Sequence, residues 1–269
     1  NYYLLSIRLA KLTGNRVLMY GCGIGPVNGE SCRRRAARVI DRNVDAITLR
    51  EDLSAEELKT MGVTKPKVYV TADPALLLEA GSEGAVDGFL LGNNIDPAGR
   101  YALFVLREWQ GFEAKKQAFV QSAKYVKDAY GLTPIFFALE PGRDLPPSRE
   151  VARELPFECP MLSAPADEKL IIGMMKKMQV VVSMRLHALI FASSVAAPLV
   201  AVSYDPKVTG FMHYIGQKHC VYFEDVTAEN LCTLIDGALT ERSEYSVDRL
   251  RALAAQNEEI AKKLLEEPI

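Results

Sequence analysis

The clearest pattern of hydrophobic and polar positions lies between residues 179 and 206. Residues 180–182 are three valines, and such a short β-branched run is typical of a buried parallel strand. A helix should follow, with Ser183 as its N-cap. Residues 198–202 are apolar again and predict the next strand, so the segment forms one βαβ unit.

The same alternation of short apolar runs and amphipathic helices recurs along the whole chain. Residues 79–100 interrupt it with glycines, two asparagines and an Asp-Pro pair, which indicates a linker. Strands are predicted at residues 17–20, 46–50, 68–70, 101–106, 134–139, 180–182, 198–202 and 219–223. We therefore predict an α/β protein with two Rossmann-like parallel sheets and a cleft between them.

This division predicts three parts of the chain. Residues 1–90 form an N-terminal Rossmann-like domain and residues 91–245 a C-terminal one. Residues 246–269 form a long amphipathic helix that packs back on the first domain.

Composition and charge exclude several classes of protein. The net charge of −2 over 269 residues gives no electrostatic argument for binding nucleic acid. No apolar run approaches the roughly 20 residues needed to span a bilayer, and the first residues do not resemble a signal peptide. The five cysteines are scattered without a CxxC pair, which favours reduced thiols in a cytoplasmic protein over a disulfide framework or a zinc site.

The candidate chemistry lies directly after the valine strand. Arg185, Leu186 and His187 occupy the first turn of the predicted helix, at the edge of the sheet where ligands of open α/β sheets bind. Backbone N–H groups at that helix terminus favour an anion, and the same terminus favours a neutral imidazole that can act as a base. His187 is by position alone equally compatible with a packed core histidine. A metal site is not indicated, because no other His, Cys or carboxylate lies at ligand spacing.

Two other patterns carry weaker signals. Residues 21–26, G-C-G-I-G-P, resemble a nucleotide-binding glycine loop, but the third glycine is misplaced and a tight turn is the favoured interpretation. Arg34, Arg38 and Arg42 recur every four residues on the next helix, opposite apolar positions. They predict a solvated stripe, with an anion-binding patch as the alternative.

Several motifs together resemble those of polysaccharide pyruvyl transferases. The main one is S-M-R-L-H-A-L-I at residues 183–190, followed by S-Y-D-P-K at residues 203–207. Further matches, in the family's order, are Y-G-C-G-I-G-P at 20–26, L-R-E-D at 49–52, A-D-P-A at 72–75 and L-R-E-W at 106–109. The type that pyruvylates N-acetylmannosamine in bacterial secondary cell-wall polymers, which serve in S-layer anchoring, is the most similar.

The resemblance implies a glycosyltransferase-B-like pair of domains, with residues 1–90 on the acceptor side and residues 91–245 on the donor side. Phosphoenolpyruvate would be the donor substrate, with no separate cofactor, and a hydroxyl pair of a sugar would be the acceptor. The donor carries a carboxylate and a phosphate, so it needs several cations. The resemblance assigns proton transfer to His187. It assigns substrate binding to Arg50, Arg107, Arg185, Leu186 and Lys207.

Three further expectations follow from the resemblance. The family has a segment of the form G-x-x-N-x-G-D ahead of the first helix predicted here, so the first domain should be truncated at its N-terminus. The acceptor would be a free sugar or a lipid-linked saccharide. A lipid-linked acceptor would bring a cytoplasmic enzyme into peripheral contact with the inner face of the membrane. The sequence is also compatible with a homo-oligomer. The alternative is a sugar-nucleotide glycosyltransferase or epimerase, which would need a carboxylate for a ribose in the second domain, and none is evident.

Overall fold

The computed structural model describes residues 2–25, 27–165, 167–241 and 245–266. Residue 1 of the predicted first domain, Pro26 of the glycine loop, residues 242–244 of the predicted second domain and residues 267–269 of the predicted C-terminal helix lie outside this description, as does residue 166. The chain forms two compact units, which we describe separately. The first comprises Asn1–Leu77 and Asp248–Ile269, and the second comprises Leu78–Val247.

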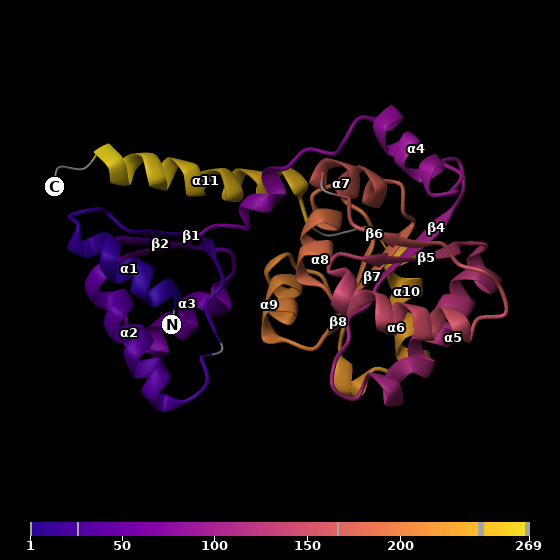
Figure 1. The fold of residues 1–269 in the computed structure, drawn as a ribbon, viewed down its shortest axis with the longest axis horizontal. Coiled ribbons are helices and arrows are strands. Elements are labelled where there is room, and N and C mark those ends of the chain that lie inside the picture. The colour runs from indigo at the N-terminus through magenta and orange to yellow at the C-terminus, as the bar shows by residue number, and fades with distance from the viewer. Residues whose placement is uncertain (1, 26, 166, 242–244, 267–269) are drawn as a thin grey trace. The chain divides into compact units, whose positions relative to one another are not determined.

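The first unit is a three-layered α/β structure around a parallel sheet of order β1-β2-β3. Its strands are β1 (Leu18–Cys22), β2 (Ala46–Leu49) and β3 (Lys67–Val70), and its helices are α1 (Tyr2–Leu12), α2 (Glu30–Asn43), α3 (Asp52–Thr60), the 3₁₀ turn η1 (Pro74–Leu77) and α11 (Val247–Glu266). Figure 1 shows α2 and α3 on one face of this sheet and α11 on the other. The central strand β2 is buried along its whole length, as an apolar strand between two neighbours must be.

Helix α2 carries the predicted arginine stripe on its exposed side, where Arg38 and Arg42 line a hollow together with Arg8 and Arg35, so the anion-binding alternative stays a prediction. Its buried residues are Ala36, Ala37 and Ile40, whereas Arg34, Arg38 and Arg42 are exposed. The apolar face joins a core cluster that includes Ile47, Leu49 and Leu58.

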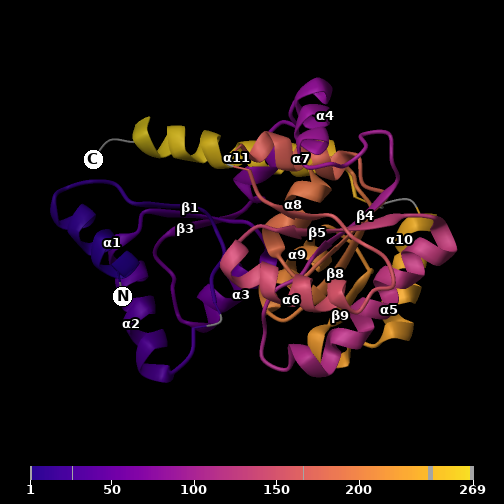
Figure 2. The same ribbon diagram turned by 45° about the vertical axis from the view of Figure 1, so that its right-hand side comes forward.

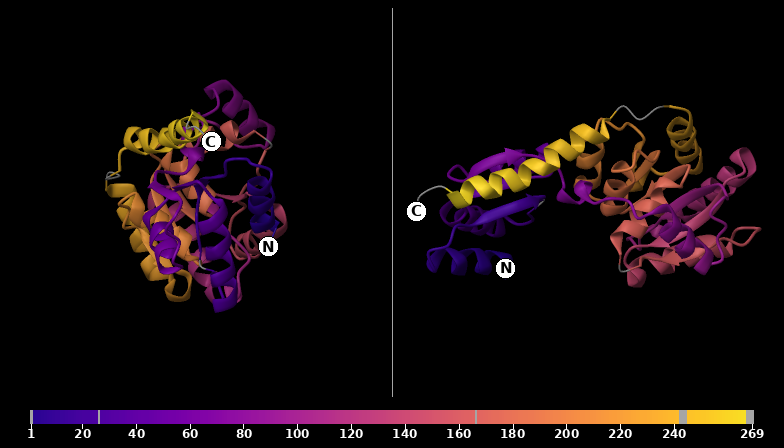
Figure 3. Two further views of the ribbon diagram at one scale, coloured as in Figure 1. Left: turned by 90° about the vertical axis from the view of Figure 1, so that its left-hand side faces the viewer. Right: turned by 90° about the horizontal axis from the view of Figure 1, so that it is seen from above.

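Helix α11 is anchored to the sheet of the first unit by a buried polar residue. The Asn257 side chain donates a hydrogen bond to the Ala72 carbonyl (2.9 Å) and accepts one from the Thr71 hydroxyl (2.9 Å). Asn257 has no exposed surface, so these hydrogen bonds replace the water that it loses. Figure 3 shows α11, in yellow, lying along the sheet of the first unit.

The second unit is built on a six-stranded, wholly parallel sheet of order β6-β5-β4-β7-β8-β9. The strands are β4 (Tyr101–Val105), β5 (Thr133–Ala138), β6 (Met161–Ser163), β7 (Val180–Ser183), β8 (Leu199–Ser203) and β9 (Cys220–Tyr222). The chain winds outward from β4 to β6, then returns to β7 and winds the other way. The point where the winding reverses therefore lies between β4 and β7, where open α/β sheets bind their ligands.

Helices cover both faces of this sheet (Figure 2). They are α4 (Glu83–Gly92), α5 (Phe112–Tyr130), α6 (Pro141–Arg153), α7 (Glu168–Lys176), α8 (Leu186–Ser193), α9 (Pro206–Tyr214) and α10 (Ala228–Thr240), with the 3₁₀ turn η2 (Phe223–Asp225). Alternate residues of β4, Ala102 and Phe104, pack in one cluster with Phe119 of α5 and Ile235 of α10. Helices α7 and α8 lie on the opposite face in Figure 2. The predicted α/β class with two parallel sheets is thus confirmed.

The structure corrects several local predictions. Residues 79–100 contain helix α4, whose buried Val86 and Leu90 are spaced one turn apart, and Gly173 lets α7 approach Val86 closely. The N-cap of α8 is Arg185 rather than Ser183, whose hydroxyl instead accepts a hydrogen bond from the Arg185 N–H (2.9 Å). Among the described residues, no helix is both long enough and apolar enough to cross a bilayer.

Replacing Asn257 by alanine should destabilise the first unit. The Ala72 carbonyl and the Thr71 hydroxyl would lose a buried partner, at a cost of about 1–3 kcal/mol in the free energy of unfolding. Urea unfolding followed by circular dichroism measures this difference. Gln256→Ala, at an exposed position of the same helix, is the matched control and should change stability by less than about 0.5 kcal/mol. Equal effects of the two substitutions would contradict the anchoring role of Asn257.

Candidate functional site

The candidate residues of the second unit gather at the C-terminal edge of its sheet. Arg107 follows β4, Arg185 and His187 follow β7, and Lys207 lies in the first turn of α9, after β8. These three strands are neighbours in the order β4-β7-β8, and the Met184 N–H donates to the Val105 carbonyl (2.9 Å), which continues the pairing to the strand ends. Leu186 begins α8, where the N–H groups of the first turn have no acceptor within the helix.

Arg185 is oriented by two carboxylates from the start of α6. Its Nε donates to Asp144 Oδ1 (2.8 Å), and its Nη2 donates to Glu140 Oε2 (2.9 Å) and also to Asp144. Asp144 has no exposed surface, so its charge is compensated by this pairing and by the Glu140 N–H, which donates to Oδ2 (2.8 Å). Burial by itself would lower the pKa of Arg185, but the hydrogen bonds and charges of Asp144 and Glu140 raise it. The guanidinium is therefore charged and held in one orientation.

Sequence reasoning missed Asp144 and Glu140. The available signal was a Pro-Gly turn after a predicted strand, flanked by two carboxylates. Nothing in the sequence pairs that turn with Arg185, which lies 41 residues beyond Asp144. The hydrogen bond from Arg185, followed by the charges of Arg185, Arg143 and Arg107, lowers the pKa of Glu140, although some loss of hydration opposes this.

Arg107 differs from Arg185 because its guanidinium is not paired with a carboxylate in the part of the chain that the structure describes. Its Nε is buried and has no hydrogen-bond partner there. The guanidinium carbon lies 5.1 Å from the centre of the Tyr204 ring, within the range of a cation–π interaction. A buried donor without an acceptor is costly, and a bound ligand is one way in which proteins satisfy it.

His187 and Lys207 are more accessible than the arginines. His187 is exposed in the first turn of α8, with its ring 6.4 Å from that of Phe191, so it is not a packed core histidine. The Lys207 ammonium lies 3.2 Å from Asp205 Oδ2. Asp205 also caps α9, because its Oδ1 accepts a hydrogen bond from the Lys207 N–H (3.0 Å).

Arg50 belongs to the first unit, where it follows β2 and is paired with two carboxylates. Its Nη1 donates to Asp73 Oδ2 (3.2 Å), and its Nε lies 3.3 Å from Glu51 Oε2. Burial raises the pKa of Glu51, although hydrogen bonds from Ser54 and Arg50 and the charge of Arg50 oppose the rise. A Cβ on Gly23 would lie 2.9 Å from Arg50 Nη2, so close packing against this arginine accounts for that glycine without a nucleotide.

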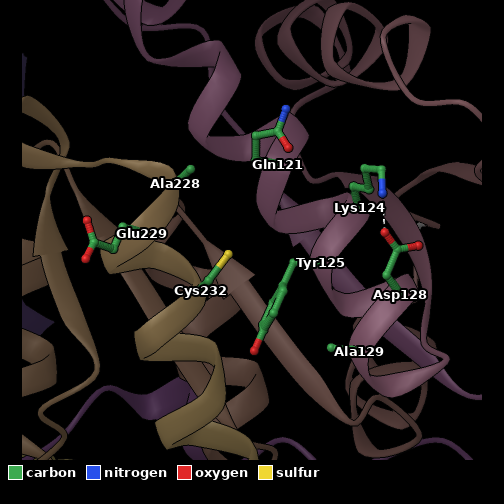
Figure 4. Close-up of a pocket in the computed structure, with 8 residues that line it drawn as sticks. All are labelled: Gln121, Lys124, Tyr125, Asp128, Ala129, Ala228, Glu229 and Cys232. Carbon is green, nitrogen blue, oxygen red and sulfur yellow. Dashed lines mark hydrogen bonds and ion pairs between the residues drawn. The ribbon is translucent and has the colours of Figure 1, made fainter.

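A metal site and a hollow between two helices are the other candidates for a functional site. Among the described residues, no three His, Cys, Asp or Glu side chains lie close enough to hold a metal ion. A hollow lies between α5 and α10, lined by Tyr125 and Cys232 among others, and Figure 4 shows Lys124 and Asp128 paired with each other there. Tyr125 and Tyr130 both donate to Asp236 on α10. The charged groups Lys124, Asp128 and Asp236 of this hollow and its surroundings therefore have partners within the two helices, whereas Arg107 has no carboxylate partner among the described residues.

Comparison with known proteins gives one family match. The model of the family described as polysaccharide pyruvyl transferase matches residues 2–206, about three quarters of the chain. A search of curated proteins gives no match.

Solved structures with a similar fold include an epimerase, a glycosyltransferase and a protein in complex with UDP. UDP-GlcNAc 2-epimerase from Methanocaldococcus jannaschii superposes with a TM-score of 0.71 at 13% identity, covering 98% of this chain and 74% of that one. HepE from Anabaena, in complex with UDP and glucose, gives 0.64 at 13% identity over 98% and 76% of the two chains. A glycosyltransferase from Rickettsia africae gives 0.65 at 14% identity over 98% and 74%. At this identity the likeness concerns the fold alone, which is of the glycosyltransferase-B type.

Asp144→Asn should destabilise the second unit although it keeps the shape of the side chain. In asparagine an NH2 group replaces one of the two carboxylate oxygens, so the side chain can no longer accept hydrogen bonds from both Arg185 and the Glu140 N–H. The negative charge that pairs with Arg185 is lost as well. We expect a loss of about 1.5–3 kcal/mol in the free energy of unfolding, the scale of a charge-assisted hydrogen bond. Urea titration of the purified variant measures it.

The control for this substitution is Asp128→Asn, which removes an exposed ion pair with Lys124 on α5. Exposed pairs contribute about 0–1 kcal/mol. A loss from Asp144→Asn no larger than that of the control would show that Asp144 does not hold Arg185 in place.

Proposed function

The chain belongs to the polysaccharide pyruvyl transferase family, and from this premise we propose that it transfers a pyruvyl group from phosphoenolpyruvate to a sugar. The proposed acceptor is N-acetylmannosamine in a cell-wall polysaccharide precursor, free or lipid-linked. The products are a pyruvate ketal and inorganic phosphate.

The observation that carries this proposal is the group of cations at the ends of β4, β7 and β8. Arg107, Arg185 and Lys207 follow three neighbouring strands, at the point where the winding of the sheet reverses. Phosphoenolpyruvate is a small, highly charged anion, and guanidinium groups can grip its carboxylate and phosphate through paired hydrogen bonds. The N–H groups of the first turn of α8, beginning at Leu186, add neutral donors.

The three cations differ in how far neighbouring carboxylates already compensate their charge. Arg185 is already paired with Asp144 and Glu140, and Lys207 contacts Asp205. Arg107 has no carboxylate partner among the described residues, and its buried Nε lacks an acceptor. We therefore assign the strongest contact with the donor to Arg107, while Arg185 orients the donor from a rigid position.

The proposed reaction balances with two hydroxyl groups of the acceptor. The methylene carbon of phosphoenolpyruvate gains a proton and becomes a methyl group, and both hydroxyl oxygens bond to the neighbouring carbon as its bond to the phosphate oxygen breaks. The acceptor loses two hydroxyl protons. One is balanced by the proton that the methylene carbon gains, and the other by the proton on the released phosphate. We assign proton transfer to His187, most simply as the base for the attacking hydroxyl, and stabilisation of the departing phosphate to the cations.

The alternative is a sugar-nucleotide enzyme. HepE and the epimerase named above share the fold, and the HepE structure contains UDP. Such a function would require a site for a nucleoside, whereas the edge described here is dominated by arginines and lysine.

Ligand-induced stabilisation should separate the two functions. A ligand that binds only the folded state raises the melting temperature by mass action, so phosphoenolpyruvate in excess over its dissociation constant should raise it by several degrees. UDP should have little effect. Differential scanning fluorimetry of the purified protein measures both. A response to UDP without one to phosphoenolpyruvate would favour the sugar-nucleotide alternative.

His187→Ala should lower turnover by about 10²- to 10⁴-fold and leave the affinity for phosphoenolpyruvate nearly unchanged, because general acid–base catalysis acts in the transition state. Phosphate release in the presence of phosphoenolpyruvate and an acceptor sugar measures turnover, and calorimetric titration measures donor affinity. His213→Ala, at another exposed histidine on α9, is the matched control and should retain full activity. Wild-type turnover of His187→Ala would remove His187 from the mechanism.

A further inference from the structure

The loop after β4 carries an exposed aromatic ring that is held against a second ring. Trp109, the single tryptophan of the chain, packs on Tyr204 with ring centres 4.5 Å apart and planes at 45°. Trp109 keeps 38% of its surface exposed although it makes this contact. Large apolar surface that stays in water beside a group of cations is a common feature of ligand sites.

The two rings come from strands on either side of β7. Trp109 follows β4 and Tyr204 follows β8, and the sheet order β4-β7-β8 puts the strand that leads to Arg185 and His187 between them. Their contact therefore bridges the end of β7. Arg107, which is two residues from Trp109, stacks on the same Tyr204 ring.

The backbone of this loop is restrained at both ends. The Glu108 N–H donates to the Arg143 carbonyl (2.8 Å), and the Trp109 carbonyl accepts from the Phe112 N–H (3.0 Å) at the start of α5. The Trp109 ring is thus presented by a loop with little freedom, so its binding would cost little conformational entropy.

We propose that Trp109 and Tyr204 form a stacking platform for the pyranose ring of the acceptor sugar. This inference rests on the proposed function and places a subsite for the acceptor in the second unit, where the resemblance alone implies only the donor side. The C–H groups on one face of a pyranose carry a small positive charge, and they are attracted to the electron-rich face of an aromatic ring. Stacking leaves the sugar hydroxyls at the ring edge directed away from the platform, where they can reach the donor.

The aromatic surface of Trp109 and Tyr204 suits an uncharged sugar ring better than it suits the anionic donor. Phosphoenolpyruvate needs cations, and Arg107, Arg185 and Lys207 supply them on the same strand ends. An indole face offers no hydrogen-bond donor to an anion, so the two kinds of surface divide between an anionic donor and an uncharged acceptor. Because Arg107 contacts Tyr204, the two subsites are adjacent, as transfer between two bound substrates requires.

Trp109 also provides a direct spectroscopic test. As the one tryptophan in the sequence, it supplies the indole fluorescence, so a sugar that stacks on it should shift the emission to shorter wavelength or quench it. The probe is a glycoside of N-acetylmannosamine, titrated with and without saturating phosphoenolpyruvate. Trp109→Phe keeps an aromatic face but removes the signal and serves as the blank. No change in emission at saturating acceptor would overturn the proposal.

Steady-state kinetics test the same platform by function. Trp109→Ala should raise the KM for the acceptor by about tenfold or more, the equivalent of one aromatic contact. Its KM for phosphoenolpyruvate should stay within about twofold of the wild type. Trp109→Phe should recover most of the acceptor affinity, and Trp109→Leu, which is apolar but not aromatic, should not.

The matched control is Tyr222→Ala, an exposed aromatic residue at the end of β9 in the same sheet. It should leave both KM values unchanged. Equal acceptor KM values for wild type and Trp109→Ala, or an equal rise in Tyr222→Ala, would refute the platform. A thermal melt of each variant identifies any general loss of structure.

Failure of the proposed function gives a different result. If phosphoenolpyruvate neither stabilises the wild-type protein nor supports phosphate release, the donor assignment fails, and the fluorescence titration still tests the sugar alone. If UDP rather than the glycoside changes the Trp109 emission, the platform binds a nucleobase and the acceptor proposal is wrong.

Discussion

A carboxylate without exposed surface has to be paired, and the pairing of Asp144 with Arg185 determines the geometry of the candidate site. Asp144 lies in α6, which follows β5, and Arg185 follows β7, while the sheet order puts β4 between these strands. The ion pair therefore spans the end of β4, just as the contact of Trp109 with Tyr204 spans the end of β7. Each bridge joins the segments that follow two strands, across the end of the strand between them. The two bridges overlap, so each restrains side chains of the candidate site from two directions.

The same pairing decides how charge is distributed along that edge. Two carboxylates neutralise the guanidinium of Arg185, so its contribution is orientation and a rigid donor rather than a large net charge. Arg107 retains its charge, because Tyr204 meets it with an aromatic face and the described residues provide no carboxylate. An anion bound here would thus be attracted mainly by Arg107 and aligned by Arg185, since Asp205 lies beside the Lys207 ammonium. Full pairing of all three cations would have left a structural ion-pair network instead.

Much of the fold could be predicted from the sequence, because its signals are local. The valine run became β7, and the arginine stripe of α2 is exposed opposite Ala36, Ala37 and Ile40. Helix α4 was missed because its apolar side consists of few residues among glycines, and it is stabilised by packing on α7. The partners of Arg185 were missed for a more general reason. Residues 41 positions apart meet through the order of strands in the sheet, which hydrophobic periodicity does not reveal.

Arg50 shows why an arginine after a strand is weak evidence for an anion site. It follows β2 as Arg107 follows β4, and both were predicted to bind the donor from the same kind of position. Asp73 and Glu51, each almost completely buried, contact Arg50 and account for its charge. Removing either carboxylate would leave a buried charge unpaired, so the cluster stabilises the first unit whether or not Arg50 binds the donor, which stays a prediction. The buried Nε lacks a hydrogen bond in both arginines, and what distinguishes Arg107 is that no carboxylate among the described residues pairs with its guanidinium. The position of an arginine in the sequence identifies a candidate, and the ion pairs of the folded chain show whether a carboxylate already compensates its charge.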